Sequence, residues 1–446
     1  MEQNRTQGSV FKNLLSFSLP FLLSYFLQTL YGMADLFLIG QFGDVAATTA
    51  VSVGSQVMHM LTVMIVGLAM GTTVSIARAV GSHDRAAVSG IIGNTVTLFM
   101  GLSAVLTVGL AAATRPIVAA MATPQEAAEG TAAYLTVCFL GIPFITAYNL
   151  LSAVFRGLGD SKSPMKFIAV ACGANIALDC LFMGVFRMGP VGAALGTTLS
   201  QGISVVLSAA VILKRREQAG ILLSKADFRP QKMRLREILH VGVPIAVQDG
   251  LIQVAFMTIT VIANHRGLDD AAAVGIVEKI IGFLFLVPSS MLSSVSALGA
   301  QNIGAGKPER AEKTLYGAML IAAGFGLTVA VLMQFFAEPT VSLFVDSETV
   351  VRMGGQYLRG YIWDCALAGI HFCFSGYFCA CGKSGLSFLH NLTAILLVRI
   401  PGAYFASANF PDTLFPMGLA TAAGSLLSVV LCVLLFAVQK KKGATA

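Results

Sequence analysis

The sequence has little charge. Asp, Glu, Lys and Arg make up 11% of its 446 residues, whereas hydrophobic residues make up 56%. Soluble domains average about 25% charged residues, which cover their surface. The scarcity of charge excludes a soluble enzyme with a large core. It predicts an all-α polytopic membrane protein whose main partner is the lipid bilayer.

The sequence also lacks paired Cys-x-x-Cys motifs. Its eight cysteines lie almost entirely inside apolar runs, where Cys behaves as a small hydrophobic residue. Cys373, Cys379 and Cys381 follow His371, but their spacing in an apolar helix does not match that of a zinc site. We therefore expect no metal at these residues.

No nucleotide-binding or catalytic motif is present. The basic turn RGLGDSKSP, Arg156–Pro164, resembles a phosphate loop, and its repeat copy ends in Cys381-Gly382-Lys383-Ser384. A Walker A motif would need a glycine at position 377, where this chain has Tyr377, and a strand before the loop. No Ser/His/Asp or metal-hydrolase pattern has a usable spacing. We expect no ATP binding, no enzymatic activity and no resident cofactor.

Apolar runs predict twelve transmembrane helices. About 20 residues cross the hydrocarbon core of a bilayer. The residues before the first run, 1–9, are polar, and that run is too long for the core of a cleavable signal, so we interpret it as the first span. The expected spans are 13–40, 46–77, 87–114, 131–155, 164–186, 190–213, 238–263, 271–301, 311–337, 353–379, 385–409 and 413–437.

Basic residues are distributed unequally between the two sides of these spans. With the first span crossing outward, 22 of the 29 Lys and Arg residues fall on one side. Basic loops stay in the cytoplasm, so both termini are expected there, in a multi-pass protein of the cell membrane. Topology alone accounts for the net charge of +7, and nucleic acid is not an expected partner.

The most polar long segment divides the chain near its midpoint. We expect an N-terminal six-helix lobe over 1–213, a cytoplasmic linker over 214–237 and a C-terminal six-helix lobe over 238–446. The halves repeat at offsets of 223 to 226 residues: Leu19-Pro20 matches Val243-Pro244, Gly43 matches Gly267, Gly159 matches Gly382, and Pro190-x-Gly192 matches Pro416-x-Gly418.

Six spans per half is an even number, so both halves enter the membrane in the same orientation. The lobes are then related by a pseudo-two-fold axis along the membrane normal. A cavity between two such lobes is the expected substrate site, and one chain suffices to form it, so we expect a monomer. Rocking of one lobe against the other would give alternating access.

The first span carries an acid inside the apolar region. The run Leu14–Gly40 is interrupted by Pro20 and contains Asp35 near its far end. A charged carboxylate in the bilayer costs about 2.5–3.5 kcal/mol on insertion scales unless it faces partners or water. Asp35 either reaches toward the outer interface or belongs to a cation or proton site, and we favour the site.

Three further polar residues are expected at the depth of Asp35. Asp179 lies about seven residues before a predicted outer turn, Thr197 lies seven after Pro190, and Asn175 is one helical turn from Asp179. Two carboxylates that approach each other favour a proton or a cation such as Na⁺ between them, so Na⁺ at Asp35 and Asp179 is the metal alternative. The alternative is that Asn175 and Asp179 only bond neighbouring helices.

The second lobe carries different charges. The repeat offset takes Asp35 to Ile259 and Asp179 into 402–405, so these acids have no counterparts there. Buried charges are expected instead at Asp249, Glu278, Asp364 and Arg399. Arg399 is expected to pair with Glu278 or Asp364. Such pairs are more often structural, so a part in transport is left open.

These residues resemble the multidrug and toxic compound extrusion (MATE) transporters over essentially the whole chain. The motifs are ADLFLIG with Asp35 fifteen residues after Pro20, the turn GLGDSKSPM, NIALD with Asn175 and Asp179, and GAALGTTLSQ with Thr197. In the typical family motif a proline follows the acid matching Asp179, whereas this chain has Cys180.

The resemblance implies a secondary antiporter that exports amphipathic, often cationic, organic compounds in exchange for H⁺ or Na⁺. It assigns Asp35, Asn175, Asp179 and Thr197 to the cation or proton site and Pro20 to bending of the first helix. The alternatives are a lipid-linked oligosaccharide flippase, which would usually have two more spans and a more basic cavity, and an ion channel, which would need a repeated filter-like segment.

Overall fold

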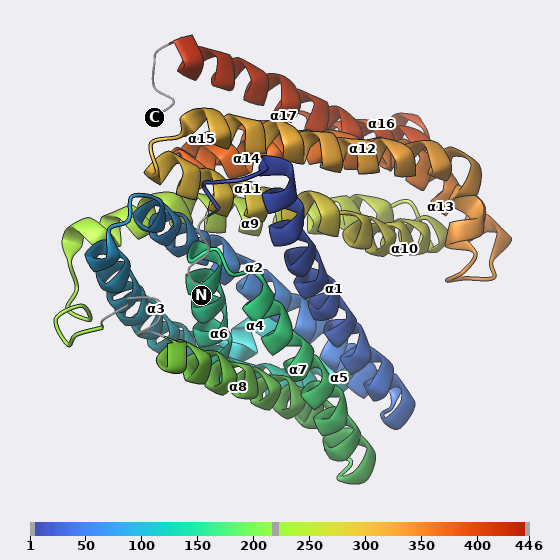
Figure 1. Ribbon diagram of the computed structural model, residues 1–446. Coiled ribbons are helices and arrows are strands. Elements are labelled where there is room, and N and C mark those ends of the chain that lie inside the picture. Colours follow the sequence, from blue (N-terminus) through green and yellow to red (C-terminus); the bar gives the residue numbers. More distant parts are fainter. Residues whose placement is uncertain (1–4, 216–222, 442–446) are drawn as a thin grey trace. The chain divides into compact units, whose positions relative to one another are not determined.

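The computed structural model describes residues 5–215 and 223–441, and every regular element in these ranges is a helix. Figure 1 shows their order along the chain. The elements are α1 Val10–Phe42, α2 Val45–Gly81, α3 Arg85–Ala112, α4 Thr114–Ala120, α5 Gln125–Leu140, α6 Ile142–Gly157, α7 Lys162–Asp179, η1 Cys180–Val185, α8 Gly189–Arg215, α9 Lys232–Asn264, α10 Leu268–Leu284, α11 Leu286–Gly304, α12 Pro308–Val341, α13 Glu348–Tyr361, α14 Trp363–Ala380, α15 Ser384–Ala394, η2 Ile395–Arg399, α16 Ile400–Asn409 and α17 Phe415–Lys441.

The prediction of an all-α polytopic membrane protein is confirmed. Within the described ranges, 11 spans are long and apolar enough to cross a membrane. The helix pair α5 and α6 passes the same test together but bends by 49° at Gly141, which brings the number to 12. Pro143 lies in the first turn of α6, where its missing amide hydrogen removes no helical hydrogen bond.

The described chain divides into two compact units. Unit 1 contains Leu23–Gly242, and unit 2 contains Arg5–Leu22 together with residues 243–441. The first boundary lies two residues after Pro20 in α1, and the second lies just before Pro244 in α9. An interior proline removes a backbone hydrogen bond, so each boundary coincides with a weakened point of a continuous helix.

Unit 1 contains two clusters of buried apolar side chains. In the first, residues of α2 and α5, including Val51, Tyr134 and Phe139, pack together with Ile142. In the second, Phe155 of α6 packs on Phe167 of α7 with ring centroids 5.4 Å apart. The second cluster also includes Ile212 of α8, and α7 packs directly on α8. These two helices carry three of the predicted site residues.

The described part of the predicted linker packs on α3. Residues 216–222 of the 214–237 segment lie outside the described ranges, and 232–237 form the first turns of α9. Asn94 donates to the Asp227 carbonyl at 3.0 Å and accepts from the Gln231 amide at 2.6 Å. The amide and hydroxyl of Ser224 both donate to the Asp227 carboxylate and hold the pKa of Asp227 below its ordinary value.

The turn Arg156–Pro164 joins the end of α6 to the first residues of α7. Asp160 accepts hydrogen bonds from the amides of Lys162 and Ser163, each at 3.0 Å. These are the first amides of α7, which have no partner within the helix. The Asp160 carboxylate therefore occupies the donors that a phosphate loop would present to its ligand.

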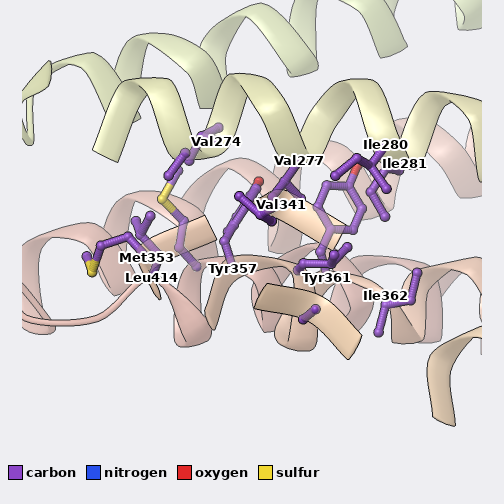
Figure 2. Packing of buried hydrophobic residues seen from close by; sticks show 14 of the residues in the cluster. Val274, Val277, Ile280, Ile281, Val341, Met353, Tyr357, Tyr361, Ile362 and Leu414 are labelled. Atoms are coloured by element: carbon purple, nitrogen blue, oxygen red, sulfur yellow. The ribbon is translucent and has the colours of Figure 1, made fainter. Parts of the chain in front are cut away.

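Unit 2 is built around α14, which packs against α11, α12 and α17. Its apolar cluster joins α10, α12, α13, α16 and α17. Figure 2 shows Tyr357 and Tyr361 of α13 pointing toward the helix that carries Val277 and Ile281. The backbones of α13 and α17 also approach closely, because a Cβ at Gly418 would lie 2.4 Å from the Tyr357 carbonyl oxygen.

Residues 5–9, which precede α1, bind to helices of unit 2. The Arg5 amide donates to the Gln301 side chain at 3.2 Å, and Arg310 donates to the Gly8 carbonyl at 2.9 Å. Lys307 donates to the Thr6 carbonyl at 3.1 Å. These bonds explain why the first part of α1 groups with unit 2, although the sequence predicts one lobe over 1–213.

Candidate cation site

Three helices of unit 1 bring the four predicted polar residues together. Asp35 comes from α1, Asn175 and Asp179 come from α7, and Thr197 comes from α8. The Thr197 hydroxyl donates to Asp35 Oδ2 at 3.0 Å. Asp35 is 5% exposed, and Asn175 and Asp179 are both 0% exposed. The acids therefore face the interior of unit 1 and do not reach toward a surface.

The helical geometry changes at Asp179. α7 ends at this residue and continues as the π-helix η1, which begins at Cys180. A π-helical turn spreads the backbone and is common at functional sites. Cys180 has a backbone amide, so the helix widens here without losing a donor.

Gly196 allows α8 to approach the acids. A Cβ at this position would lie 1.9 Å from Asp179 Oδ1 and 3.5 Å from Asn175 Nδ2. Real Cβ atoms are not found that close to a carboxylate oxygen, so any larger residue would displace Asp179. Because Thr197 is the next residue, the same close approach places its hydroxyl on Asp35.

Most polar atoms of this cluster have no hydrogen-bond partner within the described part of the chain. They are buried and comprise Asp35 Oδ1, both atoms of the Asn175 amide, and both carboxylate oxygens of Asp179. An isolated buried carboxylate is strongly unfavourable unless it is paired or protonated. Carboxylate, amide and hydroxyl oxygens are the ligands of a proton or of a hard cation, so the residues fit either ion.

Sequence reasoning missed other side chains next to this cluster. Tyr31 lies one turn before Asp35 and is close enough to interact with Asp35, Thr197 and Gln201. Gln201 in turn lies one turn after Thr197, on the same face of α8. A search of the positions four residues before Asp35 and four residues after Thr197 would have found both.

The charges predicted in the second lobe do not form one cluster. Arg399 Nη2 lies 3.0 Å from Asp364 Oδ2 and also donates to the Ser425 hydroxyl at 2.7 Å. Glu278 instead accepts from the Thr260 hydroxyl at 3.2 Å. Of the two partners expected for Arg399, the structure places Asp364 there and not Glu278. Asp249 of α9 lies near Cys379 of α14.

No group of three or more His, Cys, Asp or Glu side chains that could hold a metal ion occurs in residues 5–215 and 223–441. The candidate cation site contains two acids, Asp35 and Asp179, and their other neighbours are an amide and hydroxyls.

Across the described residues, the regular elements are all helices, and 11 to 12 of the spans can cross a membrane. Together with the internal repeat and the acids buried within a unit, this defines a polytopic membrane transporter. The MatE family model matches this chain twice, at residues 20–181 and 244–405. The chain therefore belongs to the multidrug and toxic compound extrusion family.

Relatives and solved structures agree with this assignment. The chain is 29% identical over 407 residues, 90% of each chain, to "Probable multidrug resistance protein YpnP" of Bacillus subtilis (strain 168). It is 25% identical over 400 residues, 88% of this chain and 87% of the other, to "Multidrug export protein MepA" of Staphylococcus aureus (strain MRSA252). A solved outward-facing multidrug resistance MATE family transporter has the same fold, with a TM-score of 0.91, 22% identity and coverage of 98% of both chains.

The two family matches also define which residues correspond between the halves. The second match begins and ends 224 residues after the first. With the offsets of 223 to 226 seen along the repeat, Asp35 corresponds to Ile259, and Asn175 falls within 398–401, a range that contains Arg399. In this region of the repeat, the second unit has the guanidinium of Arg399, which is paired with Asp364, whereas the first unit has two acids and an amide.

Proposed function

We propose that this protein exports amphipathic, often cationic, organic compounds from the cell in exchange for H⁺ or Na⁺, by alternating access. One observation carries the proposal: Asp35 and Asp179 lie close enough to interact in the interior of unit 1, and three of their carboxylate oxygens are buried without a hydrogen bond from another group of the described chain. The names of the relatives support organic drugs as the exported compounds.

The proposed cycle begins with an ion from outside. A proton or Na⁺ reaches the cluster and neutralises Asp35 and Asp179, whose mutual repulsion then falls. Asp35 shares a helix with Pro20, where the helix can bend because proline has no amide hydrogen to donate to the helix. Movement of α1 at this point releases the exported compound, and loss of the ion to the cytoplasm restores the starting state.

Localisation and partners follow from the same proposal. The protein lies in the cell membrane with both termini in the cytoplasm, as the distribution of its basic residues indicates. Its partners are the bilayer and a small organic substrate, it works as a monomer, and it needs neither ATP nor a cofactor.

Flux measurements with separately imposed gradients test the proposal. Purified protein is reconstituted into liposomes that are loaded with ethidium. An inward H⁺ gradient, an inward Na⁺ gradient or no gradient is then applied. We expect ethidium movement against its own gradient with at least one ion, and none without a gradient. Ethidium movement that follows neither ion would contradict antiport, and single-channel currents would indicate a channel.

Replacing Gly196 by alanine should weaken ion binding without removing an acid. The added methyl group would lie 1.9 Å from Asp179 Oδ1, and overpacking of this kind costs about 1–3 kcal/mol. We expect roughly a five- to hundredfold higher ion concentration for half-maximal ethidium flux.

Gly202→Ala is the matched control on the same helix. A Cβ at Gly202 lies no closer than 3.7 Å to Phe144, which is an ordinary contact, so flux should stay at the wild-type value. Equal ion dependence of Gly196→Ala and Gly202→Ala would show that the close approach of α8 to Asp179 has no part in ion binding.

A further inference from the structure

The segment 224–236, which leads from α8 into α9, carries four exposed basic side chains. They are Lys225, Arg229, Lys232 and Arg236. None of them forms an ion pair within residues 5–215 and 223–441. Both flanking helices are candidate membrane spans, so the segment lies at a membrane surface whichever way the chain is oriented. Basic side chains at such a surface are attracted to anionic lipids.

Hydrogen bonds fix this segment on α3, beside which it lies in Figure 1. Besides the two bonds of Asn94, the Thr97 hydroxyl donates to the Phe228 carbonyl at 2.7 Å, and Arg234 donates to the Ala87 carbonyl at 2.9 Å. The contact thus extends along α3 from Ala87 to Thr97, which is about 15 Å at the rise of an α-helix.

Two glycines of α3 allow this close contact. A Cβ at Gly90 would overlap the Arg234 guanidinium, and a Cβ at Gly93 would overlap the Asp227 carbonyl. The segment therefore has a defined position against α3. Its outward side chains are held in a defined arrangement on the surface of unit 1.

The burial pattern of α3 gives the depth of the segment in the membrane. Residues 88–95 are buried on every face of the helix, where the segment and neighbouring helices cover them. Further along, α3 exposes apolar side chains, with Met100 38% and Val108 72% exposed. Exposed apolar side chains on a membrane span mark the part inside the hydrocarbon. The hydrocarbon therefore begins near Met100, one turn after Thr97, and Phe228 lies at that boundary.

Exposed apolar side chains alternate with the bases of the segment. Phe228 is 38% exposed beside Arg229, and Met233 is 84% exposed beside Lys232. Orientation in the membrane accounts for the bases but not for apolar side chains exposed next to them. Surfaces that bind anionic membranes combine both, because the apolar side chains enter the headgroup region while the bases meet the phosphates.

The charges of the segment also lack compensation. Lys232 and Arg236 lie one turn apart on the same face of α9, where like charges repel. Asp227 is the acid of residues 224–236, and its carboxylate already accepts from the amide and hydroxyl of Ser224. A bound phosphate would supply the negative charge that these bases do not find within the described chain.

We propose that Lys225, Arg229 and Lys232 bind the phosphate of an anionic phospholipid, with Phe228 at the edge of its acyl chains. The bound lipid holds the segment against the membrane, at the point where the chain passes from the first repeat to the second. This proposal goes beyond the antiport function and does not depend on it.

Quenching by brominated lipids tests the site. The sequence has one tryptophan, Trp363, so Trp363→Phe combined with Phe228→Trp gives a single fluorescent reporter. The full-length protein is placed in phosphatidylcholine nanodiscs that contain a small fraction of brominated phosphatidylglycerol or, in a parallel sample, of brominated phosphatidylcholine. Bromine on an acyl chain quenches a tryptophan that it contacts. We expect quenching by both lipids, and more by the anionic phosphatidylglycerol.

Removing the bases should remove this preference. Lys225→Gln, Arg229→Gln and Lys232→Gln are combined in the reporter protein. Each base near a membrane surface contributes roughly a fivefold factor in affinity for anionic lipid. We expect the ratio of quenching by brominated phosphatidylglycerol to that by brominated phosphatidylcholine to fall to about one, the value for lipids without preference.

Two controls separate the site from the overall charge of the protein. Lys162→Gln, Lys166→Gln and Lys313→Gln remove the same charge from exposed positions on α7 and α12, and the reporter protein with these changes should keep its preference. A Val108→Trp reporter, on the lipid-facing part of α3, should be quenched equally by the two brominated lipids.

Three results would overturn the proposal. If neither lipid quenches the Phe228→Trp reporter, the segment does not touch the bilayer. If both lipids quench it equally, the bases bind no anionic headgroup. If the two triple variants behave alike, any preference comes from the total charge and not from this site. These measurements use neither ethidium nor an ion gradient, so each of these failures leaves the antiport function untouched.

Discussion

Replacing Asp35 by asparagine should remove ion-driven export. Asparagine has nearly the same shape and can still accept from Thr197, but it has neither the charge that binds a cation nor the group that binds a proton. Contacts to charged groups contribute about 1.5–3 kcal/mol, which corresponds to a roughly 10- to 150-fold loss of ion affinity. Efflux of ethidium from liposomes under an imposed H⁺ or Na⁺ gradient measures the change.

Asp44→Asn is the matched control for this substitution. Asp44 caps α2 by accepting from the Ala47 amide at 2.7 Å, and asparagine caps helices equally well. Asp44→Asn changes the charge of the chain by the same amount as Asp35→Asn and lies nine residues away. Efflux by this variant should therefore equal that of the wild type. If the Asp35→Asn variant exports ethidium at the wild-type rate at every ion concentration, Asp35 has no part in the mechanism.

Replacing Asp364 by alanine should destabilise the second unit strongly. The Asp364 side chain is completely buried, and that of Arg399 is 12% exposed. Removing one partner of a buried ion pair leaves a charge without compensation and costs about 3–5 kcal/mol. We expect a large fall in the thermal unfolding temperature of the purified protein, independent of any ion gradient.

Two further variants make this second prediction specific. Asp364→Leu combined with Arg399→Met removes both charges and should recover much of the stability, because apolar residues often replace a buried pair without loss. Glu338→Gln breaks an ion pair of 3.0 Å whose side chains are 31% and 41% exposed, and it should change stability by no more than about 1 kcal/mol. If Asp364→Ala unfolds at the wild-type temperature, the Asp364–Arg399 pair does not stabilise unit 2.

Much of the site in unit 1 follows from counting residues along the sequence. Asp35, Asn175, Asp179 and Thr197 lie at similar distances from predicted turns, and the structure brings them together. Counting residues from the turns works because each membrane span is a regular helix of known rise per residue. The number of residues from a turn therefore gives the depth of a side chain below the membrane surface. Which ion they bind stays a prediction.

Other features depend on how helices pack, which spacing does not give. Gly196 is one glycine among 45, and only the 1.9 Å approach to Asp179 distinguishes it. The choice of Asp364 over Glu278 as the partner of Arg399 depends on the helix faces that meet in unit 2.

The boundary within α1 also could not be read from the sequence. Pro20 predicts a point of bending, and the helix is continuous through it. The grouping of Arg5–Leu22 with unit 2 comes from hydrogen bonds between residues about 300 positions apart, such as Arg310 to Gly8. Contacts at that separation have no local signature.

The central claim is that the acids of unit 1 hold the ion that is exchanged for the organic substrate. The most direct measurement is the release of H⁺ or ²²Na⁺ from purified protein when ethidium is added, without any gradient. We predict that the wild-type protein releases one of these ions and that Asp35→Asn and Asp179→Asn release neither from this site. Release by both variants in the wild-type amount would contradict the account.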